Sequence, residues 1–308
     1  MLSNRNIQMS ESECRIVSSR GILKSCKYHS AFPGSTTSQI DYEVEADLYP
    51  FLKTKPMTHY ACTYALTDFA TRILPTLKKP IILVSGDSDV TVPTDNMGAA
   101  TQILASPMII AWFSQNCVGG HPKLHQLPIG LDYHTLTRGE HAWGPPAHPY
   151  QQELELSTIR EKAPILPNRK VKCYANFQFL MNTRYAAIDR VDAQNSIPSD
   201  LIYYEPSPVP RHETWKTMAQ HAFVPSPHGN GLDCHRTWEA LALGCIPIVR
   251  TSKLDPLFEG LPVWIVKDWT DVTQAAMTQV HREFWGRTFA MERLTLAFWM
   301  AKINAFKE

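Results

Sequence analysis

One segment of the sequence, residues 225–249 (PSPHGNGLDCHRTWEALALGCIPIV), places a polar loop before a predicted helix and a following strand. Gly229 and Gly231 in the loop permit positive φ angles and a close approach of the backbone to a ligand. Asp233 is a suitable N-cap for the helix, and Gly244 stands where a helix C′ residue belongs. The free N–H groups at such a helix start, together with the helix dipole, suit a diphosphate.

Charged side chains of that helix share one face. Glu239 follows Arg236 by three residues and His235 by four, a spacing that stacks them along the helix. Arg236, near the first turn, could form charge-assisted bonds with a diphosphate, and Glu239, one turn deeper, could accept bonds from both ribose hydroxyls. The competing interpretation is a simple i,i+3 ion pair between Arg236 and Glu239 on a solvated helix. Trp238 and Leu241 fall on the opposite side and are predicted to be core.

Candidate catalytic carboxylates lie in the first half of the chain. Asp87 and Asp89 follow a predicted buried strand at 80–84, so they emerge at the carboxyl edge of a parallel sheet, where α/β sites lie. Either could act as a general base, with Asp87 preferred, or could cap the turn as an Asx motif. Their Asp-x-Asp spacing could also ligate a hard cation. Asp132 and His134, after a Pro-Ile-Gly turn, are the reserve candidates for the base.

The elements that must position these residues alternate between strand and helix. Short apolar, β-branched runs predict strands at 80–84, 108–113, 124–127, 171–175, 201–204, 222–224, 245–249 and 263–266. Helical spacing of apolar residues predicts helices at 60–77, 151–161, 183–192, 213–221 and 234–243, with further helices over 271–298. This alternation favours βαβ units and parallel sheets. Repeated Gly and Pro residues place a domain junction near 140–168.

Length, charge and cysteine content indicate which classes of protein this chain does not fit. The 308 residues correspond to about two domains. With 30 Lys+Arg against 29 Asp+Glu, the net charge of +1 disfavours nucleic acid as a partner but leaves room for one local anion site. The longest apolar stretches have roughly half of the ~20 residues that cross a bilayer, so no transmembrane segment is expected. Seven cysteines without a CxxC pair predict neither a disulfide framework nor a metal site, and they favour a reduced, cytoplasmic location.

Several runs of the sequence resemble a known family. Residues 226–241 (SPHGNGLDCHRTWEAL), followed by GCIPIV at 244–249, resemble the donor-binding signature of exostosin-like glycosyltransferases. Further similar runs are LPV at 261–263, DW at 268–269, WFSQN at 112–116 and PIGLDY at 128–133, so the resemblance spans roughly residues 80–135 and 171–270. Small soluble versions encoded by large DNA viruses of algae are similar too, and one of those is similar to a xylosyltransferase.

The resemblance implies a GT-B fold, in which two Rossmann-like α/β lobes face each other across a cleft. Residues 1–150 would form an N-terminal acceptor-binding lobe and residues 165–285 a C-terminal nucleotide-sugar-binding lobe. Residues 286–308 would form a C-terminal helix that crosses back to pack on the N-terminal lobe. At this length both lobes must be minimal, without the stem and membrane anchor that are usual in the family.

The implied reaction is an inverting transfer of a sugar, with xylose expected first, from a UDP-sugar to a hydroxyl of an oligosaccharide or glycoprotein acceptor. It needs no metal or other cofactor, and it would take place in the cytoplasm, or in the host cytoplasm if the protein is viral. A base must take the acceptor's proton, and positive groups must stabilise the departing diphosphate.

The base is expected to be Asp87, Asp89 or Asp132. The donor-binding residues are expected to be Asn176, Arg184, Arg211, Ser226, His228, Gly229, Asn230, Gly231, His235, Arg236 and Glu239. Other interpretations stay open: a metal-dependent, GT-A-like transferase that uses Asp87 and Asp89, a phosphorylase-type or hydrolytic enzyme, and a non-catalytic sugar-nucleotide-binding module.

Overall fold

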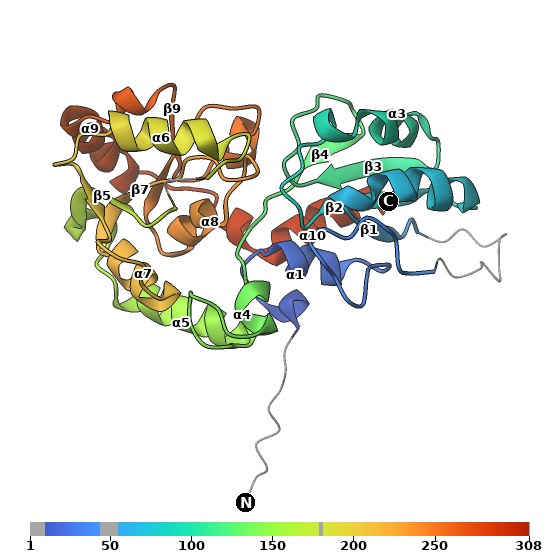
Figure 1. The fold of residues 1–308 in the computed structure, drawn as a ribbon, viewed down its shortest axis with the longest axis horizontal. Coiled ribbons are helices and arrows are strands. Elements are labelled where there is room, and N and C mark those ends of the chain that lie inside the picture. Colours follow the sequence, from blue (N-terminus) through green and yellow to red (C-terminus); the bar gives the residue numbers. More distant parts are fainter. Residues whose placement is uncertain (1–9, 44–54, 179–180, 308) are drawn as a thin grey trace, which may run out of the picture.

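Two parallel β-sheets form the framework of the protein in a computed structural model, which describes residues 10–43, 55–178 and 181–307. The first sheet has four strands in the order β1-β2-β3-β4, and the second has five in the order β6-β5-β7-β8-β9. Each sheet, with its helices, forms one lobe, and we call these the N-terminal lobe and the C-terminal lobe (Figure 1). The prediction of a mixed α/β chain with two parallel sheets is confirmed.

The N-terminal sheet is buried on both faces. Its central strand β2 has no exposed residue, because Ile82 and Val84 pack into one apolar cluster while Ile81 and Leu83 pack into another on the opposite face. This two-sided burial is why the strand has a continuous apolar sequence rather than an alternating one. The strands are β1 (Thr58–Cys62), β2 (Ile81–Gly86), β3 (Ile109–Ser114) and β4 (Leu124–Gln126).

Helices from both ends of the chain cover one face of this sheet. The last helix, α10, lies beside α1 on the N-terminal lobe (Figure 1). The backbone joins them as well, since the N–H of Val17 donates to the carbonyl of Leu294 at 2.9 Å. Trp299 of α10 is fully buried in the same apolar cluster as Val84. The helices of this lobe are α1 (Ser19–Ser25), α2 (Leu66–Asp68), α3 (Met97–Ala105) and α10 (Leu296–Asn304).

The prediction of a single helix at 60–77 is wrong at its start. Residues Thr58–Cys62 form strand β1, and helical turns of 3₁₀, α and π type follow only over 63–76. Tyr60 and Ala61 are both buried. Tyr60 fits the helical spacing of the apolar residues that follow it, so periodicity alone does not separate the end of this strand from the start of a helix.

The C-terminal lobe is a doubly wound α/β unit. Its strands are β5 (Lys170–Ala175), β6 (Ile202–Tyr204), β7 (His221–Pro225), β8 (Ile246–Arg250) and β9 (Trp264–Val266). Its helices are α6 (Ala186–Ser196), α7 (Arg211–Met218), α8 (His235–Ala242) and α9 (Gln274–Trp285). The strands and helices predicted over this half of the chain are found, with small shifts at their ends.

The strand order of this sheet locates a crevice. From β5 the chain passes to β6 on one side and then returns to β7 on the other side, so the connections diverge between β5 and β7. In open parallel sheets, ligands bind outside the carboxyl ends of the strands at such a switch point. The carboxyl ends here are followed by Asn176 and by Ser226.

Two helices, α4 (His134–Arg138) and α5 (Pro149–Lys162), connect the lobes. Proline at the first position of α5 suits a helix start, because its missing N–H has no partner there in any case. Short 3₁₀ turns lie at Glu11–Glu13, Thr94–Asn96, Leu166–Asn168, Asp255–Phe258, Trp269–Asp271, Met291–Leu294 and Ala305–Lys307. Over the described ranges, no helix combines the length and the apolar character that a bilayer span requires.

Candidate functional site

The predicted donor-binding segment begins at the switch point of the C-terminal sheet. Ser226, directly after β7, is buried, and its hydroxyl hydrogen-bonds with the hydroxyl of Thr237 in α8 at 2.8 Å. Asn176, directly after β5, donates from Nδ2 to the Thr214 hydroxyl at 2.6 Å. The fold therefore brings the ends of two neighbouring strands and the first turns of α8 to one edge of the sheet.

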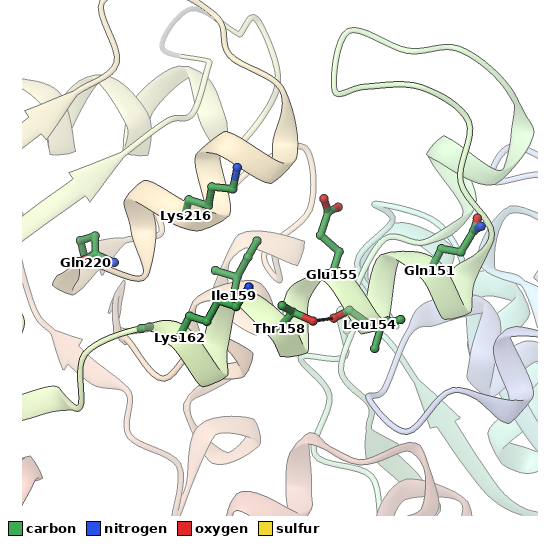
Figure 2. A pocket seen from close by; sticks show the side chains of 9 residues that line it. Gln151, Leu154, Glu155, Thr158, Ile159, Lys162, Lys216 and Gln220 are labelled. Carbon is green, nitrogen blue, oxygen red and sulfur yellow. Dashed lines mark hydrogen bonds between the residues drawn. The ribbon is translucent and has the colours of Figure 1, made fainter.

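A groove of about 550 Å³ lies elsewhere, between α5 and α7 (Figure 2). Its lining combines apolar side chains such as Leu154 and Ile159 with separate charges on Lys162, Lys216 and Glu155. No residue predicted for the site contributes to it. Because none of the predicted residues lines this groove and Lys216 is already paired with Glu213, we place the candidate site at the switch point instead.

Helix α8 begins one residue later than predicted. Its N-cap is Cys234, and Asp233 is therefore not the cap. The Asp233 carboxylate instead accepts bonds from the backbone N–H of Ile129 at 2.8 Å and from Trp238 Nε1 at 2.9 Å. It thus links the N-terminal lobe, through Ile129, to Trp238 of α8. At the other end, Gly244 has a φ of +74°, as predicted for the C′ position.

Gly229 and Gly231 allow close packing against neighbouring residues, and neither adopts a positive φ angle. Neither Gly229 nor Gly231 is among the residues with positive φ, so that part of the prediction is wrong. A Cβ atom on Gly231 would lie 2.8 Å from the Asn116 amide nitrogen and 3.1 Å from the carbonyl oxygen of Asp89. Glycine is needed here because the loop approaches the N-terminal lobe too closely for a side chain. Asn230, between the glycines, is exposed.

Arg236 and Glu239 do not neutralise each other through a direct contact. Across the described residues, neither takes part in an ion pair, so the competing i,i+3 interpretation is wrong. Arg236 Nη1 donates to the Pro227 carbonyl at 3.3 Å and to the Ser226 hydroxyl at 3.4 Å. Burial lowers the pKa of Arg236 to about 10, and the charge of Glu239 opposes that shift. Both side chains are half-buried on one face of α8.

A second arginine, which the sequence did not indicate, lies beside this loop. Arg190 of α6 is 7% exposed, and its Nε donates to the carbonyl of His228 at 3.1 Å. The guanidinium carbon of Arg190 lies 5.8 Å from the ring centre of Phe177, and that of Arg236 lies 4.8 Å from the same ring. No motif contains Arg190, and a single arginine in a helix gives no sequence signal for such a role.

The neighbouring residue Asp189 holds the loop against α6. Its Oδ2 accepts the backbone N–H of His228 at 2.8 Å, and its Oδ1 accepts Trp269 Nε1 at 2.7 Å. His228 Nδ1 also hydrogen-bonds to the carbonyl of Leu232 at 2.8 Å. These bonds give His228 a role in shaping the loop.

Arg184 and Arg211, two further arginines expected near the donor, have partners of their own. Arg184 is exposed and pairs with Asp95 of the N-terminal lobe at 2.6 Å. Arg211 is buried, donating from Nη1 to the carbonyl of Asp132 at 2.6 Å and from Nη2 to the side-chain oxygen of Gln152. Both arginines therefore connect parts of the chain that lie far apart in sequence, and their expected role at a diphosphate stays a prediction.

Asp87 and Asp89 have very different surroundings. Asp87 is 4% exposed; its carboxylate lies 3.2 Å from Arg20 Nη2 and accepts the hydroxyl of Ser35 at 3.2 Å. Burial raises the pKa of Asp87, while Arg20 and Ser35 act in the opposite direction. Asp89 is exposed at the carboxyl edge of β2, with its carbonyl beside Gly231. Within the described ranges no group of three or more His, Cys, Asp or Glu side chains is arranged to hold a metal ion.

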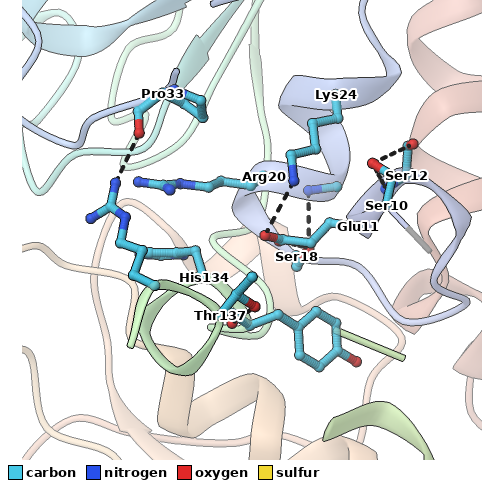
Figure 3. A network of polar contacts seen from close by, with 12 residues as sticks. Ser10, Glu11, Ser12, Ser18, Arg20, Lys24, Pro33, His134 and Thr137 are labelled. Atoms are coloured by element: carbon cyan, nitrogen blue, oxygen red, sulfur yellow. Dashed lines mark hydrogen bonds and ion pairs between the residues drawn. The ribbon is translucent and has the colours of Figure 1, made fainter. Parts of the chain in front are cut away.

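The partner of Asp87, Arg20, is positioned by α1 and its N-cap. The Ser18 hydroxyl donates to Glu11 at 2.9 Å, and Lys24 lies 3.9 Å from the same carboxylate. Figure 3 shows this network beside Arg20. Burial raises the pKa of Glu11, against the effect of Lys24, Ser18 and Arg20.

Asp132 lies between two histidines at the junction of the lobes. Its two carboxylate oxygens accept the backbone N–H of Thr135 at 2.9 Å and its hydroxyl at 2.6 Å. His134 Nδ1 lies 3.2 Å from Asp132, and the His134 and His235 rings are 6.3 Å apart. Burial would raise the pKa of Asp132, but His235, His134 and the Thr135 bonds outweigh it and lower the pKa to about 2. His235 Nδ1 hydrogen-bonds to the carbonyl of Gly130 at 2.7 Å.

Comparisons with known proteins identify no family for this chain. No protein-family model matches it, and a search of curated proteins finds no match.

Proposed function

We propose that the protein is a glycosyltransferase of GT-B type, which moves a sugar from a nucleotide-diphosphate donor to a hydroxyl of a glycan acceptor. One observation carries the proposal: Arg236 and Glu239 share one face of α8, beside the switch point, and neither forms an ion pair with a described residue. A cation at the helix start and a free carboxylate one turn deeper match the two ends of a ribose diphosphate. UDP-xylose is the donor proposed first.

The donor would bind along the first turns of α8. Arg236 and the N–H groups of this eight-residue helix's first turn would hold the diphosphate. Glu239 would accept hydrogen bonds from the ribose hydroxyls, since nothing in the described structure donates to its carboxylate. His235 turns toward Gly130 of the other lobe, so it lies between the donor helix and the acceptor side.

The reaction itself requires little covalent chemistry from the protein. The acceptor oxygen attacks the anomeric carbon as the bond from that carbon to the phosphate oxygen breaks, and the electron pair leaves with the diphosphate. A carboxylate takes the acceptor proton. Of the three candidates, geometry favours Asp89, because it is exposed and its backbone lies beside Gly231 of the donor loop. Asp87 and Asp132 are both buried, with their oxygens engaged by Arg20 and Thr135.

The interpretation with a metal bound between Asp87 and Asp89 finds less support. The Asp87 carboxylate is turned inward to Arg20 and Ser35, whereas Asp89 is at the surface. Two carboxylates would have to point at one cation to hold it.

The seven cysteines are free thiols, five of them buried, which supports a reducing compartment such as the cytoplasm as the place of the reaction.

The test is nucleotide release from a panel of UDP- and GDP-sugars in the presence of glycan acceptors. We expect acceptor-dependent release of UDP, strongest with UDP-xylose and undiminished by EDTA. A melting temperature that rises with UDP, without turnover of any donor, would instead indicate a binding module. Activity that EDTA removes and Mn²⁺ restores would favour the metal-dependent interpretation.

A further inference from the structure

We propose that Arg190 and Arg236 act together as a binding site for a pyrophosphoryl anion, with the ring of Phe177 against both guanidinium groups. This inference rests on the proposed function only for the source of that anion, a nucleotide diphosphate. The two arginines come from different helices, α6 and α8. Only the folded chain brings them to the same loop.

Their position relative to the loop follows from three contacts. Arg190 Nη1 donates to the carbonyl of Gln178 at 2.7 Å, and its Nε donates to that of His228 at 3.1 Å. The remaining nitrogen, Nη2, lies 3.3 Å from where a Cβ atom on Gly229 would stand. The guanidinium is therefore held beside Gly229, and one of its nitrogens is left without an acceptor among the described residues.

Within the described structure, the charges of Arg190 and Arg236 are not paired with a carboxylate. Four arginines of the described structure pair with carboxylates: Arg20 with Asp87, Arg72 with Asp68, Arg184 with Asp95, and Arg250 with three aspartates. The buried Arg169 and Arg211 have no carboxylate partner among the described residues, but both of their terminal guanidinium nitrogens donate to protein acceptors. Arg190 and Arg236 have no carboxylate within 4 Å in the same parts of the chain. Burial, together with the positive charge of Arg190, lowers the pKa of Arg236 to about 10. Two partly buried like charges without a counterion are costly, and a bound anion offsets that cost.

The nearest aspartate cannot serve as that counterion. The Asp189 oxygens already accept Trp269 Nε1 at 2.7 Å and the N–H of His228 at 2.8 Å. Arg250 lies 3.5 Å from the same carboxylate. The Asp189 oxygens thus hold the loop in place, and the charge of Asp189 acts on Arg190 without a direct ion pair in the described structure.

The free donors indicate the class of anion. Arg236 donates only from Nη1, to Ser226 and Pro227, so its Nε and Nη2 have no acceptor in the described ranges. Guanidinium groups bind phosphoryl oxygens through paired donors, and two such groups suit two linked phosphates better than one. When the donor's glycosidic bond breaks, the negative charge grows on these phosphates, and both arginines would stabilise it.

Inorganic pyrophosphate is the direct probe, measured by isothermal titration calorimetry on the whole chain. Arg190→Gln and Arg236→Gln should each weaken its binding by about tenfold or more, and the double variant should abolish it. Arg282→Gln is the matched control, because Arg282 is exposed on α9. UMP and orthophosphate should bind more weakly than UDP and pyrophosphate, and raising the salt concentration should weaken all four.

Arg190→Lys separates a binding role from a structural one. It keeps the charge but loses the paired donors, so a folded Lys variant should retain part of the affinity that the Gln variant loses. Wild-type affinity in Arg190→Gln, or no pyrophosphate binding by the unmodified protein, would overturn the inference. Pyrophosphate binding that needs both arginines, without turnover of any nucleotide sugar, would contradict the proposed function and leave this site standing.

Discussion

Gly231 of the C-terminal lobe approaches Asn116 of the N-terminal lobe so closely that a Cβ atom would come within 2.8 Å of the Asn116 amide nitrogen. Asn116 is fully buried with a φ of +48°, and its Oδ1 accepts the N–H of Asp233 at 2.9 Å. Its Nδ2 donates to the carbonyl of Ser88. One buried amide thus joins the donor loop to the segment that carries the candidate base.

Gly231→Ala should therefore destabilise the protein. The added methyl group must push against Asn116 and the Asp89 carbonyl, and overpacking of this kind costs about 1–3 kcal/mol. Gly98→Ala is the matched control, because Gly98 lies in α3 with open space around it; replacing a helical glycine should stabilise by up to about 1 kcal/mol. Denaturant unfolding measures both, and equal effects of the two substitutions would contradict the close contact.

Asp233 should make stability depend on pH. Burial raises its pKa to about 6, against hydrogen bonds from Ile129 and Trp238. Because the folded pKa exceeds that of an unfolded aspartate, the group stabilises the fold below about pH 4 and loses this contribution as the pH rises through about 6. Asparagine does not titrate in this range. The free energy of unfolding of Asp233→Asn, minus that of wild type, should therefore rise by roughly 2–3 kcal/mol from pH 4 to pH 7. A difference that stays constant over this range in urea unfolding would show that Asp233 does not titrate there.

Glu239 should be needed for nucleotide binding. Glu239→Ala removes the proposed acceptor of both ribose hydroxyls, and we expect the affinity for UDP to fall by about tenfold or more. Glu239→Gln keeps one acceptor oxygen and should lose less. Glu161→Ala, at an exposed position of α5, is the control. Calorimetry with UDP measures the effect; UDP affinity that Glu239→Ala leaves unchanged would remove Glu239 from the site.

Asp87 and Asp89 should behave differently when each is changed to Asn. Asp89→Asn should lower kcat by about 10²–10⁴-fold and leave the KM for the donor unchanged, as expected for a general base. Asp87→Asn should instead lower the free energy of unfolding by about 3–5 kcal/mol, because Arg20 would remain buried without its partner. Steady-state kinetics and denaturant unfolding on both variants separate the roles. A stable Asp87→Asn protein without turnover would return the base to Asp87.

Local patterns predicted much of the fold. Most strands and helices follow from apolar runs and from Gly and Pro signals, and the shared face of Arg236 and Glu239 follows from helical spacing alone. The errors occur where a short stretch of sequence is compatible with two different local structures. Strand β1 was missed because Tyr60 fits the helical spacing of the apolar residues that follow it, and Asp233 looked like an N-cap because it stands near a helix start. Its carboxylate instead bonds to Trp238 and to Ile129, which is 104 residues away.

The sequence by itself determined the alternation of strands and helices, the end of α8 at Gly244 and the polar character of the donor loop, because each depends on residues a few positions apart. Only the tertiary structure decided which charges are neutralised. Arg20 and Asp87, 67 residues apart, become partners, whereas Arg190 and Arg236 meet at one loop and neither forms an ion pair with a described carboxylate. Whether a charged side chain has a counterion depends on which distant segments the fold places beside it, and no local sequence pattern determines this.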